Sequence, residues 1–284
     1  MRILKNFPIN GKHNKSIITD LYFNQTNKQK PLVIFCHGYK GYKDWGAFDL
    51  MSSKFLKAGL ALVKFNFSHN GCTLDQPIDF PDLVAFGNNN YTKELDDLND
   101  VIDWVQNYFK SNLFVNSNNI CLLGHSRGGG ICILKASRDQ RIKKVITLAS
   151  VCDFKKRTKA ISDLKDWKKT GVAYVLNRRT HQKMPHFYQF YEDLIANSEA
   201  LNIEAATKQI QIPQLIIHGD SDSSVSIEEA QKLHIWNPKS ELRTVKNANH
   251  VFNTKHPWDF DIVSPEFFSM ICLTVNFIMN KHNE

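Results

Sequence analysis

A serine lies between two glycines where an apolar run gives way to a helical pattern. The segment Gly124-His-Ser126-Arg-Gly128 follows the apolar run 120–123 and precedes the helical pattern 131–136. The spacing G-x-S-x-G predicts a sharp strand-to-helix turn that exposes the serine hydroxyl at a helix N-terminus. The helix dipole and the free backbone amides favour developing negative charge there. Ser126 is therefore the candidate nucleophile for attack on a carbonyl carbon.

Acyl transfer also needs two donors for the negatively charged oxygen of its tetrahedral intermediate. In such a turn, one donor is the backbone N–H of the residue after the nucleophile, here Arg127. The other comes from the loop after an earlier strand. His37-Gly38-Tyr39 follows the apolar run 31–36, so the Tyr39 amide is the second candidate. His37 is interpreted as a structural histidine that shapes this loop.

Two aspartates follow the apolar run 214–217 and are candidates for the acid that orients a catalytic histidine. Asp222 lies out in the loop, in the chain order serine, acid, histidine, and is the preferred candidate. Asp220 stands nearer the strand and is expected to cap the turn. Asp153, after the preceding strand, is a rarer location for the acid and remains an alternative.

The catalytic base is expected to be His250, which follows the last strand-like run, 241–245. His256 is the alternative, although the proline directly after it suits a structural turn. We therefore predict that Ser126, Asp222 and His250 form a catalytic triad, with no cofactor and no metal ion.

The elements that must position these residues alternate along the chain. Short apolar runs are typical of strands buried on both faces, and segments with helical spacing of apolar residues separate them. A hairpin at 3–9 and 17–23 comes first. The further strands are expected at 31–36, 60–67, 120–123, 144–148, 214–217 and 241–245, and the helices at 45–57, 91–109, 131–136, 227–235 and 267–279. This alternation predicts an α/β fold with a doubly wound, mostly parallel sheet.

One stretch, between residues 150 and 212, interrupts the alternation with helical fragments and no clear strand. We expect a single domain over residues 1–284, with residues 151–211 inserted as a helical cap. Residues 155–183 carry ten basic and two acidic side chains, so this segment has the +8 charge of the whole chain. These charges either guide an anionic substrate or form a solvated surface. The aromatic residues Phe187, Tyr188 and Tyr191 either line an acyl pocket or seal the cap.

The composition bounds the remaining classes of function. Hydrophobic residues make up 42% of the chain and charged residues 23%, as in globular proteins. No stretch approaches the roughly 18–20 apolar residues of a membrane span, and the N-terminal sequence lacks the apolar run of a signal peptide. We therefore expect a cytoplasmic protein. The six cysteines form no C-x-x-C pair and are interpreted as buried free thiols. No nucleic-acid-binding motif accompanies the basic charge.

These motifs together resemble the α/β-hydrolase superfamily, in particular bacterial serine hydrolases of the dienelactone hydrolase, cinnamoyl esterase and acyl-aminopeptidase-like group. The resemblance is carried by His37-Gly38, Gly124-His-Ser126-Arg-Gly128, His218-Gly-Asp-Ser-Asp222 and Asn249-His250. Two positions differ. Ser126 stands where the original dienelactone hydrolases use cysteine, and Arg127 stands where cinnamoyl esterases usually have an apolar residue or glutamine.

The resemblance implies the α/β-hydrolase fold and hydrolysis of a carboxylic ester, or a related acyl bond, through an acyl-enzyme. The substrate would be a small acyl compound, and the basic cap is compatible with an anionic one. The same triad serves thioesterases, peptidases and perhydrolases. A non-catalytic binding protein on this fold is the alternative from another class, although no member of the triad is missing.

Overall fold

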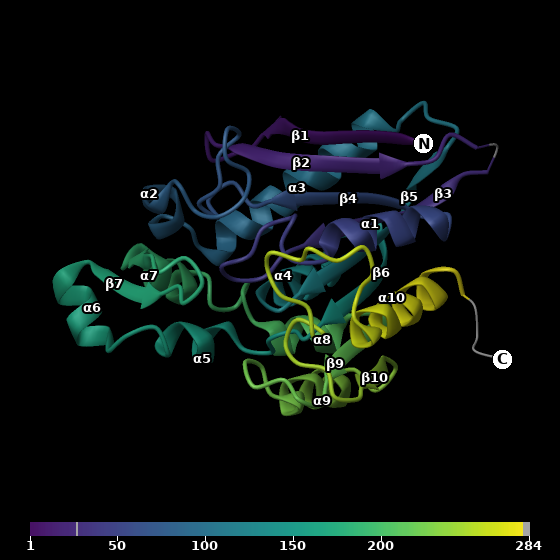
Figure 1. Ribbon diagram of the computed structural model, residues 1–284. Coiled ribbons are helices and arrows are strands. Elements are labelled where there is room, and N and C mark those ends of the chain that lie inside the picture. The colour runs from purple at the N-terminus through teal and green to yellow at the C-terminus, as the bar shows by residue number, and fades with distance from the viewer. Residues whose placement is uncertain (27, 281–284) are drawn as a thin grey trace.

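An eight-stranded sheet forms the centre of the protein (Figure 1). The computed structural model describes residues 1–26 and 28–280; residues 27 and 281–284 of the expected single domain lie outside the described residues. The spatial order of the strands is β1, β2, β4, β3, β5, β6, β9, β10. Their bounds are β1 Arg2–Asn10, β2 Ser16–Phe23, β3 Lys30–Cys36, β4 Ala61–Asn66, β5 Val115–His125, β6 Ile142–Leu148, β9 Gln214–Gly219 and β10 Glu241–Val245.

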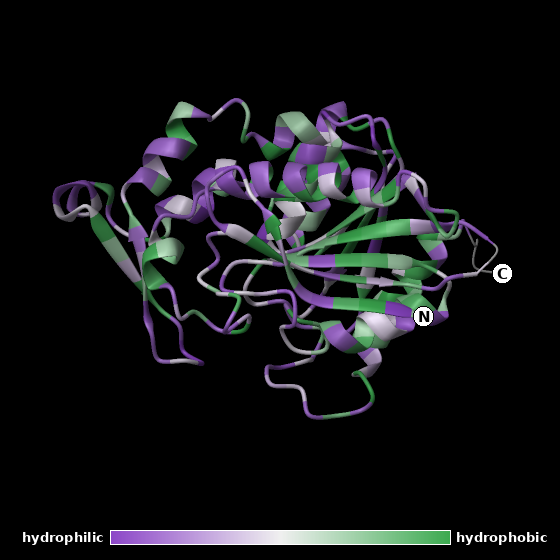
Figure 2. Cartoon of the chain, turned by 90° about the horizontal axis from the view of Figure 1, so that it is seen from above, coloured by the Kyte–Doolittle hydropathy of each residue, from purple (hydrophilic) through white to green (hydrophobic). Residues whose placement is uncertain are grey.

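The sheet is parallel except at one edge. β1 pairs antiparallel with β2, and β2 pairs antiparallel with β4. Every neighbouring pair from β4 to β10 is parallel. All residues of β4 and β9 are buried, because helices cover both faces of a parallel sheet. Figure 2 shows the resulting run of hydrophobic colour along the central strands. The predicted doubly wound, mostly parallel sheet is therefore confirmed.

Two layers of helices enclose this sheet. α1 and α10 cover one face, where Phe48, Met51 and Met270 pack in a common core. α3, α4, α8 and α9 cover the other face, where Leu98 and Ile131 belong to a second core. The bounds of the helices are α1 Phe48–Lys57, α2 Leu83–Gly87, α3 Tyr91–Tyr108, α4 Arg127–Ala136, α8 Ile203–Gln209, α9 Ile227–Trp236 and α10 Pro265–Ile278.

Local sequence signals explain where the long helices begin. Asn90 precedes α3, and its side chain accepts a hydrogen bond of 2.9 Å from the backbone N–H of Lys93. Ser264 precedes α10 in the same way, and Pro265 occupies the first helical position. Both arrangements satisfy amides that the first turn of a helix leaves free. Such caps hold the helices, and the loops between them, in register with the sheet.

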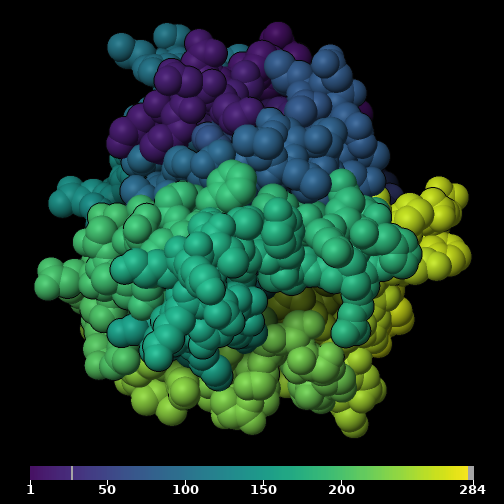
Figure 3. All heavy atoms as spheres, turned by 90° about the vertical axis from the view of Figure 1, so that its left-hand side faces the viewer, coloured from purple at the N-terminus to yellow at the C-terminus, as the bar shows by residue number. Residues whose placement is uncertain are grey.

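An insertion between β6 and β9 extends beyond one end of the sheet (left in Figure 1). It contains α5 Phe154–Lys159, α6 Leu164–Thr170, β7 Val172–Leu176, β8 Lys183–Phe187, α7 Gln189–Ala196 and α8. In the space-filling view of this end, the teal and green insertion spreads across the middle of the face (Figure 3). Helices are present in this segment, and its role as a cap over residues 151–211 stays a prediction.

The expectation that the insertion lacks strands is wrong. β7 and β8 form an antiparallel hairpin that is separate from the main sheet. Its strands have five residues each, and only part of each strand is buried. Strands this short carry too few residues for a periodic pattern to stand out in a sequence.

Two further sequence expectations concern the state of the cysteines and the absence of a membrane span. The six cysteines are free, and five of them are buried, as interpreted from their apolar surroundings. Within residues 1–26 and 28–280, no helix combines the length and the apolar character needed to cross a membrane.

Candidate active site

Ser126 lies at the turn between β5 and α4. Its backbone has φ 56° and ψ −118°, a left-handed conformation that a serine rarely adopts. A side chain at Gly124 would place its Cβ 2.3 Å from the Gly128 carbonyl oxygen, and one at Gly128 would lie 2.4 Å from the Cys36 carbonyl oxygen. Both positions therefore require glycine, and the turn holds the serine above the carboxyl end of the sheet.

The structure brings the three predicted triad residues together. His250 Nε2 lies 3.1 Å from Ser126 Oγ, and His250 Nδ1 lies 2.8 Å from Asp222 Oδ2. Asp222 comes from the loop after β9, and His250 from the loop after β10. Because parallel strands end at the same edge of a sheet, three distant parts of the sequence meet there. The imidazole is thus placed to accept the serine proton.

Buried hydrogen bonds keep Asp222 in its charged form. Burial alone would raise the pKa of this carboxyl, but hydrogen bonds from His218, His250 and the Val225 amide outweigh it and hold the pKa well below its usual range. The other carboxylate oxygen accepts hydrogen bonds of 2.8 Å and 2.9 Å from the backbone N–H groups of Ser224 and Val225. The carboxylate is therefore fixed in position and ionised at neutral pH.

His218 is a partner of the acid that the sequence analysis missed. Its Nε2 lies 3.3 Å from Asp222 Oδ2 and 2.8 Å from the Val225 carbonyl oxygen. Since both neighbours are acceptors, this nitrogen carries the proton. The only sequence signal is its place four residues before Asp222, at the end of a buried strand.

His125 supports the base in a similar way and was also missed. Its Nε2 lies 2.8 Å from the His250 carbonyl oxygen, so the ring donates to the backbone of the base. Burial, and then the neighbouring His250, lowers the pKa of His125 to about 3, so this ring is neutral at physiological pH. It holds the loop of His250 by donating to its backbone carbonyl.

The alternative acids and base have structural partners elsewhere. Asp220 accepts a hydrogen bond of 2.6 Å from the Asn247 amide, and Asp153 caps α5 by accepting one of 2.9 Å from the Lys156 amide. His256 Nδ1 accepts a hydrogen bond of 3.0 Å from the Gly46 amide. None of the three is hydrogen-bonded to Ser126 or His250 in the described residues.

The two expected amide donors flank Ser126. Arg127 is the first residue of α4, and Tyr39 lies in the loop after β3. A Cβ at Gly38 would lie 2.9 Å from Ser126 Cβ, so this loop packs directly on the nucleophile. Neither the Tyr39 nor the Arg127 amide donates a hydrogen bond to another described residue. Both amides are therefore free to donate to a ligand.

His37 holds the loop that carries Tyr39. Its Nδ1 lies 2.9 Å from the Gly38 carbonyl oxygen, and its Nε2 accepts a hydrogen bond of 3.3 Å from the Phe67 amide. Burial lowers the pKa of His37 to about 4, so the ring stays neutral and keeps this pattern. These bonds agree with its interpretation as a structural histidine.

A hydrogen bond joins the insertion to this loop. Tyr39 Oη lies 2.7 Å from Nε2 of His186, a buried residue of β8. The Arg127 guanidinium lies over the Tyr39 ring, 4.4 Å from its centre, and 3.3 Å from Glu94 Oε1. The side chains of both oxyanion candidates are thus packed and paired, which fixes the backbone that carries the amides.

Two cavities meet at Ser126. The larger, of about 380 Å³, has mainly apolar walls that include Val151, Phe154 and Ile161. The smaller, of about 230 Å³, is also mainly apolar and includes Trp45, Phe48 and Asn177. Ser126, His250, Tyr39 and Lys40 line both cavities. Ser126 therefore lies at the junction of the two cavities.

The aromatic residues proposed for the acyl pocket lie outside both cavities. Phe187 packs so closely on Gly87 that a Cβ there would be 2.9 Å from its ring. Tyr188 and Tyr191 pack on Trp167, with ring centroids 6.0 Å and 6.5 Å apart. These aromatics seal the insertion, which is the second of the two roles considered. Whether such a ring faces a cavity depends on its position within a strand or helix of the insertion. The residue types alone do not specify this.

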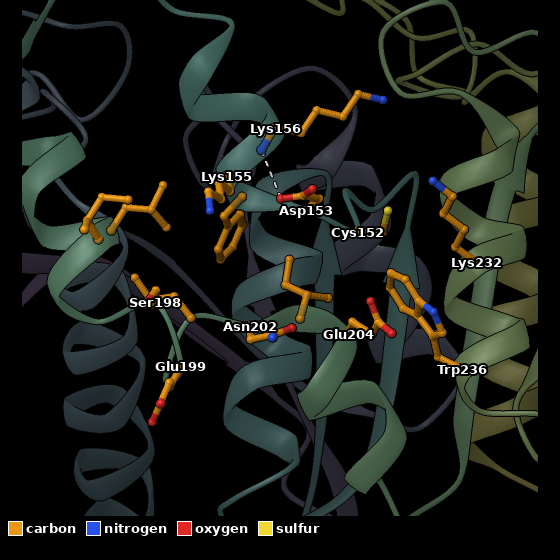
Figure 4. A pocket seen from close by; sticks show the side chains of 15 residues that line it. Cys152, Asp153, Lys155, Lys156, Ser198, Glu199, Asn202, Glu204, Lys232 and Trp236 are labelled. Carbon is orange, nitrogen blue, oxygen red and sulfur yellow. Dashed lines mark hydrogen bonds between the residues drawn. The ribbon is translucent and has the colours of Figure 1, made fainter. Parts of the chain in front are cut away.

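Most of the basic residues of the insertion also lie away from Ser126. Arg157 and Arg179 line the two cavities. Lys155 and Lys156 line a separate groove of about 500 Å³, with Lys232 and Trp236 of α9 on its far side (Figure 4). The +8 charge of the segment is therefore spread over several surfaces.

One group of carboxylates in the described residues is close enough to share a metal ion: Asp20, Asp44 and Asp49. Lys43 and Lys64 already form salt bridges with it, so ammonium groups neutralise these carboxylates. None of the five residues lines either cavity at Ser126. We refer to them as the ion network.

Comparison with known proteins agrees with this geometry. Residues 19–236 match the model of the BD-FAE family. The fold is similar to that of Est1E from Butyrivibrio proteoclasticus, with a TM-score of 0.70, 16% identity and 98% of each chain covered. It is also similar to the α/β hydrolase GrgF from a Penicillium species, with a TM-score of 0.67, 17% identity and 99% of each chain covered. A curated Escherichia coli relative, an uncharacterized 31.7 kDa protein from the traX-finO intergenic region, is 26% identical over 127 residues.

That E. coli match spans 45% of this chain and only 40% of the relative, so it says little about either whole protein. The family match is broader. It covers well over half of the chain and includes both Ser126 and Asp222. The chain belongs to the BD-FAE family, an esterase family of the α/β-hydrolase superfamily.

Proposed function

We propose that the protein hydrolyses carboxylic esters, with Ser126 as nucleophile, His250 as general base and Asp222 as the acid that orients it. One observation carries the proposal: Asp222, His250 and Ser126 form a hydrogen-bonded series that ends at a hydroxyl between two cavities. Family membership supports the ester bond as the target. No cofactor is part of this proposal, because the three side chains supply every proton transfer.

In the first half of the reaction, Ser126 Oγ attacks the ester carbonyl carbon while its proton passes to His250 Nε2. The carbonyl oxygen becomes an oxyanion, to which the backbone N–H groups of Tyr39 and Arg127 donate hydrogen bonds. The charge of Asp222 stabilises the imidazolium. Collapse of the intermediate breaks the ester C–O bond, the alcohol leaves with the proton from His250, and the acyl group stays on Ser126.

In the second half, water attacks the acyl-enzyme. His250 takes a proton from this water, a second oxyanion forms between the same two amides, and its collapse returns the proton to Ser126 Oγ. The carboxylic acid leaves, and the free enzyme is restored. Each amide acts twice, so a donor that is fixed before substrate binds lowers both barriers.

The cavities indicate the size of the substrate. The larger one, of about 380 Å³, is lined by Val151, Phe154, Ile161 and Val225, which suit an apolar group. One of the similar structures is Est1E with ferulic acid bound, with a TM-score of 0.71, 18% identity and 96% of each chain covered. Small aromatic acids therefore belong among the acyl groups to be tested.

A panel of substrates tests the proposal. Purified protein is assayed with methyl and p-nitrophenyl esters of aliphatic and cinnamic acids, beside matched thioesters and amides. We expect ester turnover that saturates with substrate concentration. Thioester turnover above ester turnover would move the assignment to a thioesterase. Binding of these compounds with no turnover of any of them would contradict the proposal and favour a non-catalytic binding protein.

A further inference from the structure

The charged side chains that line the two cavities at Ser126 are all basic, although the ionised Asp222 lies behind His250. Four basic side chains line the two cavities: Lys40, Arg127, Arg157 and Arg179. No aspartate or glutamate side chain is part of the walls of either cavity. Apolar walls concentrate the field of any of these charges that lacks an acidic partner.

Three of these four cations are already neutralised. Arg127 lies 3.3 Å from Glu94, Arg157 forms a salt bridge with Glu229, and Arg179 forms one with Asp79. These pairs neutralise the charge of the guanidinium groups, although Arg157 Nε has no hydrogen-bond partner among the described residues. They leave Lys40 as the basic group of the cavities whose charge has no fixed partner.

Lys40 has no salt bridge to any residue in the described part of the chain. Its ammonium group lies over the Tyr39 ring, 5.1 Å from the ring centre. Burial, and then the positive charges of Arg127 and Arg178, lowers the pKa of Lys40. A half-buried ammonium group beside two arginines is unfavourable by itself, and an anion placed next to it would remove that cost.

Lys40 also stands at the junction of the two cavities. It lines both of them and directly follows Tyr39, whose amide is an oxyanion candidate. A group that contacts Lys40 therefore lies close to the scissile bond. The ammonium group is a compact charge with three donors, and a carboxylate can accept a charge-assisted hydrogen bond from it.

We propose that the substrate is an ester that carries a carboxylate near its scissile bond, and that Lys40 binds this carboxylate. The inference rests on the proposed ester hydrolysis at Ser126. Lys40 is then a specificity-determining residue: it contributes little to a neutral ester and a charge-assisted hydrogen bond to an anionic one.

Two matched pairs of esters test the inference. Monomethyl adipate and methyl heptanoate place a carboxylate, or a neutral chain of similar length, on the acyl side. Para-acetoxybenzoate and para-acetoxybenzamide place a carboxylate, or a neutral amide, on the leaving group. For at least one pair, we expect kcat/KM to favour the anionic member and this preference to weaken as salt rises.

Substitutions of Lys40 test whether this residue causes the preference for anionic esters. In Lys40→Gln, the ratio of anionic to neutral kcat/KM should fall about 10- to 100-fold, the effect of losing one hydrogen bond to a charged group. Lys40→Arg should restore most of the ratio. Lys155→Gln is the matched control, because Lys155 lines the separate groove of Figure 4, and its ratio should equal that of the wild type.

Two results would overturn the inference while leaving ester hydrolysis intact: equal kcat/KM within both pairs, or a preference that persists in Lys40→Gln. If no ester is turned over, the proposed function is wrong, and binding decides the role of Lys40. Calorimetry with monomethyl adipate should then show binding to the wild type that Lys40→Gln loses. Absence of binding to the wild type would overturn the inference as well.

Discussion

Two clusters of buried polar groups in this protein have different surroundings. In the ion network, the side chains of Asp20, Lys43 and Lys64 are 0% exposed, and every charge faces an opposite charge. In the series Asp222–His250–Ser126, the acid is equally buried, but the last group faces two cavities. A high density of buried charges therefore does not identify a reactive site. A reactive site is identified by an activated group that borders a cavity.

The positions of the clusters explain this difference. Lys64 lies within β4 and Asp20 within β2, where neighbouring strands and α1 enclose them. Ser126, Asp222 and His250 follow the ends of parallel strands, where loops replace neighbouring strands and leave space. We expect substitutions in the ion network to change stability and substitutions at the strand ends to change activity.

Ser126→Ala should have the largest effect. Loss of the nucleophile is expected to lower kcat by a factor on the order of 10⁶, because the remaining groups cannot form an acyl-enzyme. The free energy of unfolding should change by less than about 1 kcal/mol, since a single hydroxyl is removed. Steady-state kinetics and urea denaturation measure the two quantities. Ser221→Ala, at an exposed serine, is the control and should resemble the wild type.

Asp222→Asn should be the next most damaging change. A neutral amide cannot stabilise the imidazolium and can favour the wrong tautomer of His250, so kcat is expected to fall by roughly 10⁴-fold. Asp220→Asn is the matched comparison, since Asp220 only accepts hydrogen bonds in an exposed turn. A larger loss in Asp220→Asn than in Asp222→Asn would show that the acid has been misassigned.

Lys64→Met should destabilise the protein without a comparable loss of chemistry. It leaves the fully buried carboxylate of Asp20 and the largely buried one of Asp44 with fewer cations, a cost of about 3–5 kcal/mol when one partner of a buried pair is removed. Lys143→Met, at an exposed position, should cost far less. We expect kcat of the folded Lys64→Met protein to stay within ten times that of the wild type. A loss as large as that of Asp222→Asn would place the ion network in the chemistry.

Asp97 differs from both clusters, because it is a buried carboxyl with no salt bridge among the described residues. Burial, opposed by the Ser68 amide, raises the pKa of Asp97 to about 7. This exceeds the unfolded value of about 3.9, so the folded state binds more protons and stability decreases as pH rises through that window.

Asp97→Asn should remove this decrease, which amounts to at most about 1.4 kcal/mol per pH unit. Urea denaturation between pH 4 and 8 measures it, with Asp100→Asn as the more exposed control on the same helix. Identical pH dependence in the wild type and in Asp97→Asn would show that Asp97 is charged in the folded protein.

The sequence predicted the sheet, and it also predicted that Ser126, Asp222 and His250 come together, for a physical reason. Apolar runs must be strands when both faces are buried, and the polar residues after Leu123, Ile217 and Val245 must then meet at one edge. The run 241–245 has the same bounds as β10.

The supporting residues and the insertion were less predictable. His125 and His218 act through contacts made only after the strands assemble, and nothing in their spacing specifies a hydrogen-bond partner. The hairpin of β7 and β8 is too short for a periodic pattern. The directions of Tyr188 and Tyr191 depend on how α7 packs on Trp167, which residue types do not encode.

Covalent labelling of Ser126 tests the central claim most directly. The protein is incubated with a fluorophosphonate, digested, and the modified residue located by mass spectrometry. An activated serine attacks phosphorus and displaces fluoride, whereas unactivated serines do not react. We predict one adduct, on Ser126, that blocks ester hydrolysis in proportion to labelling and is absent from Ser126→Ala. Active protein that stays unlabelled, or an adduct on another residue that abolishes activity, would contradict the assignment of Ser126 as the nucleophile.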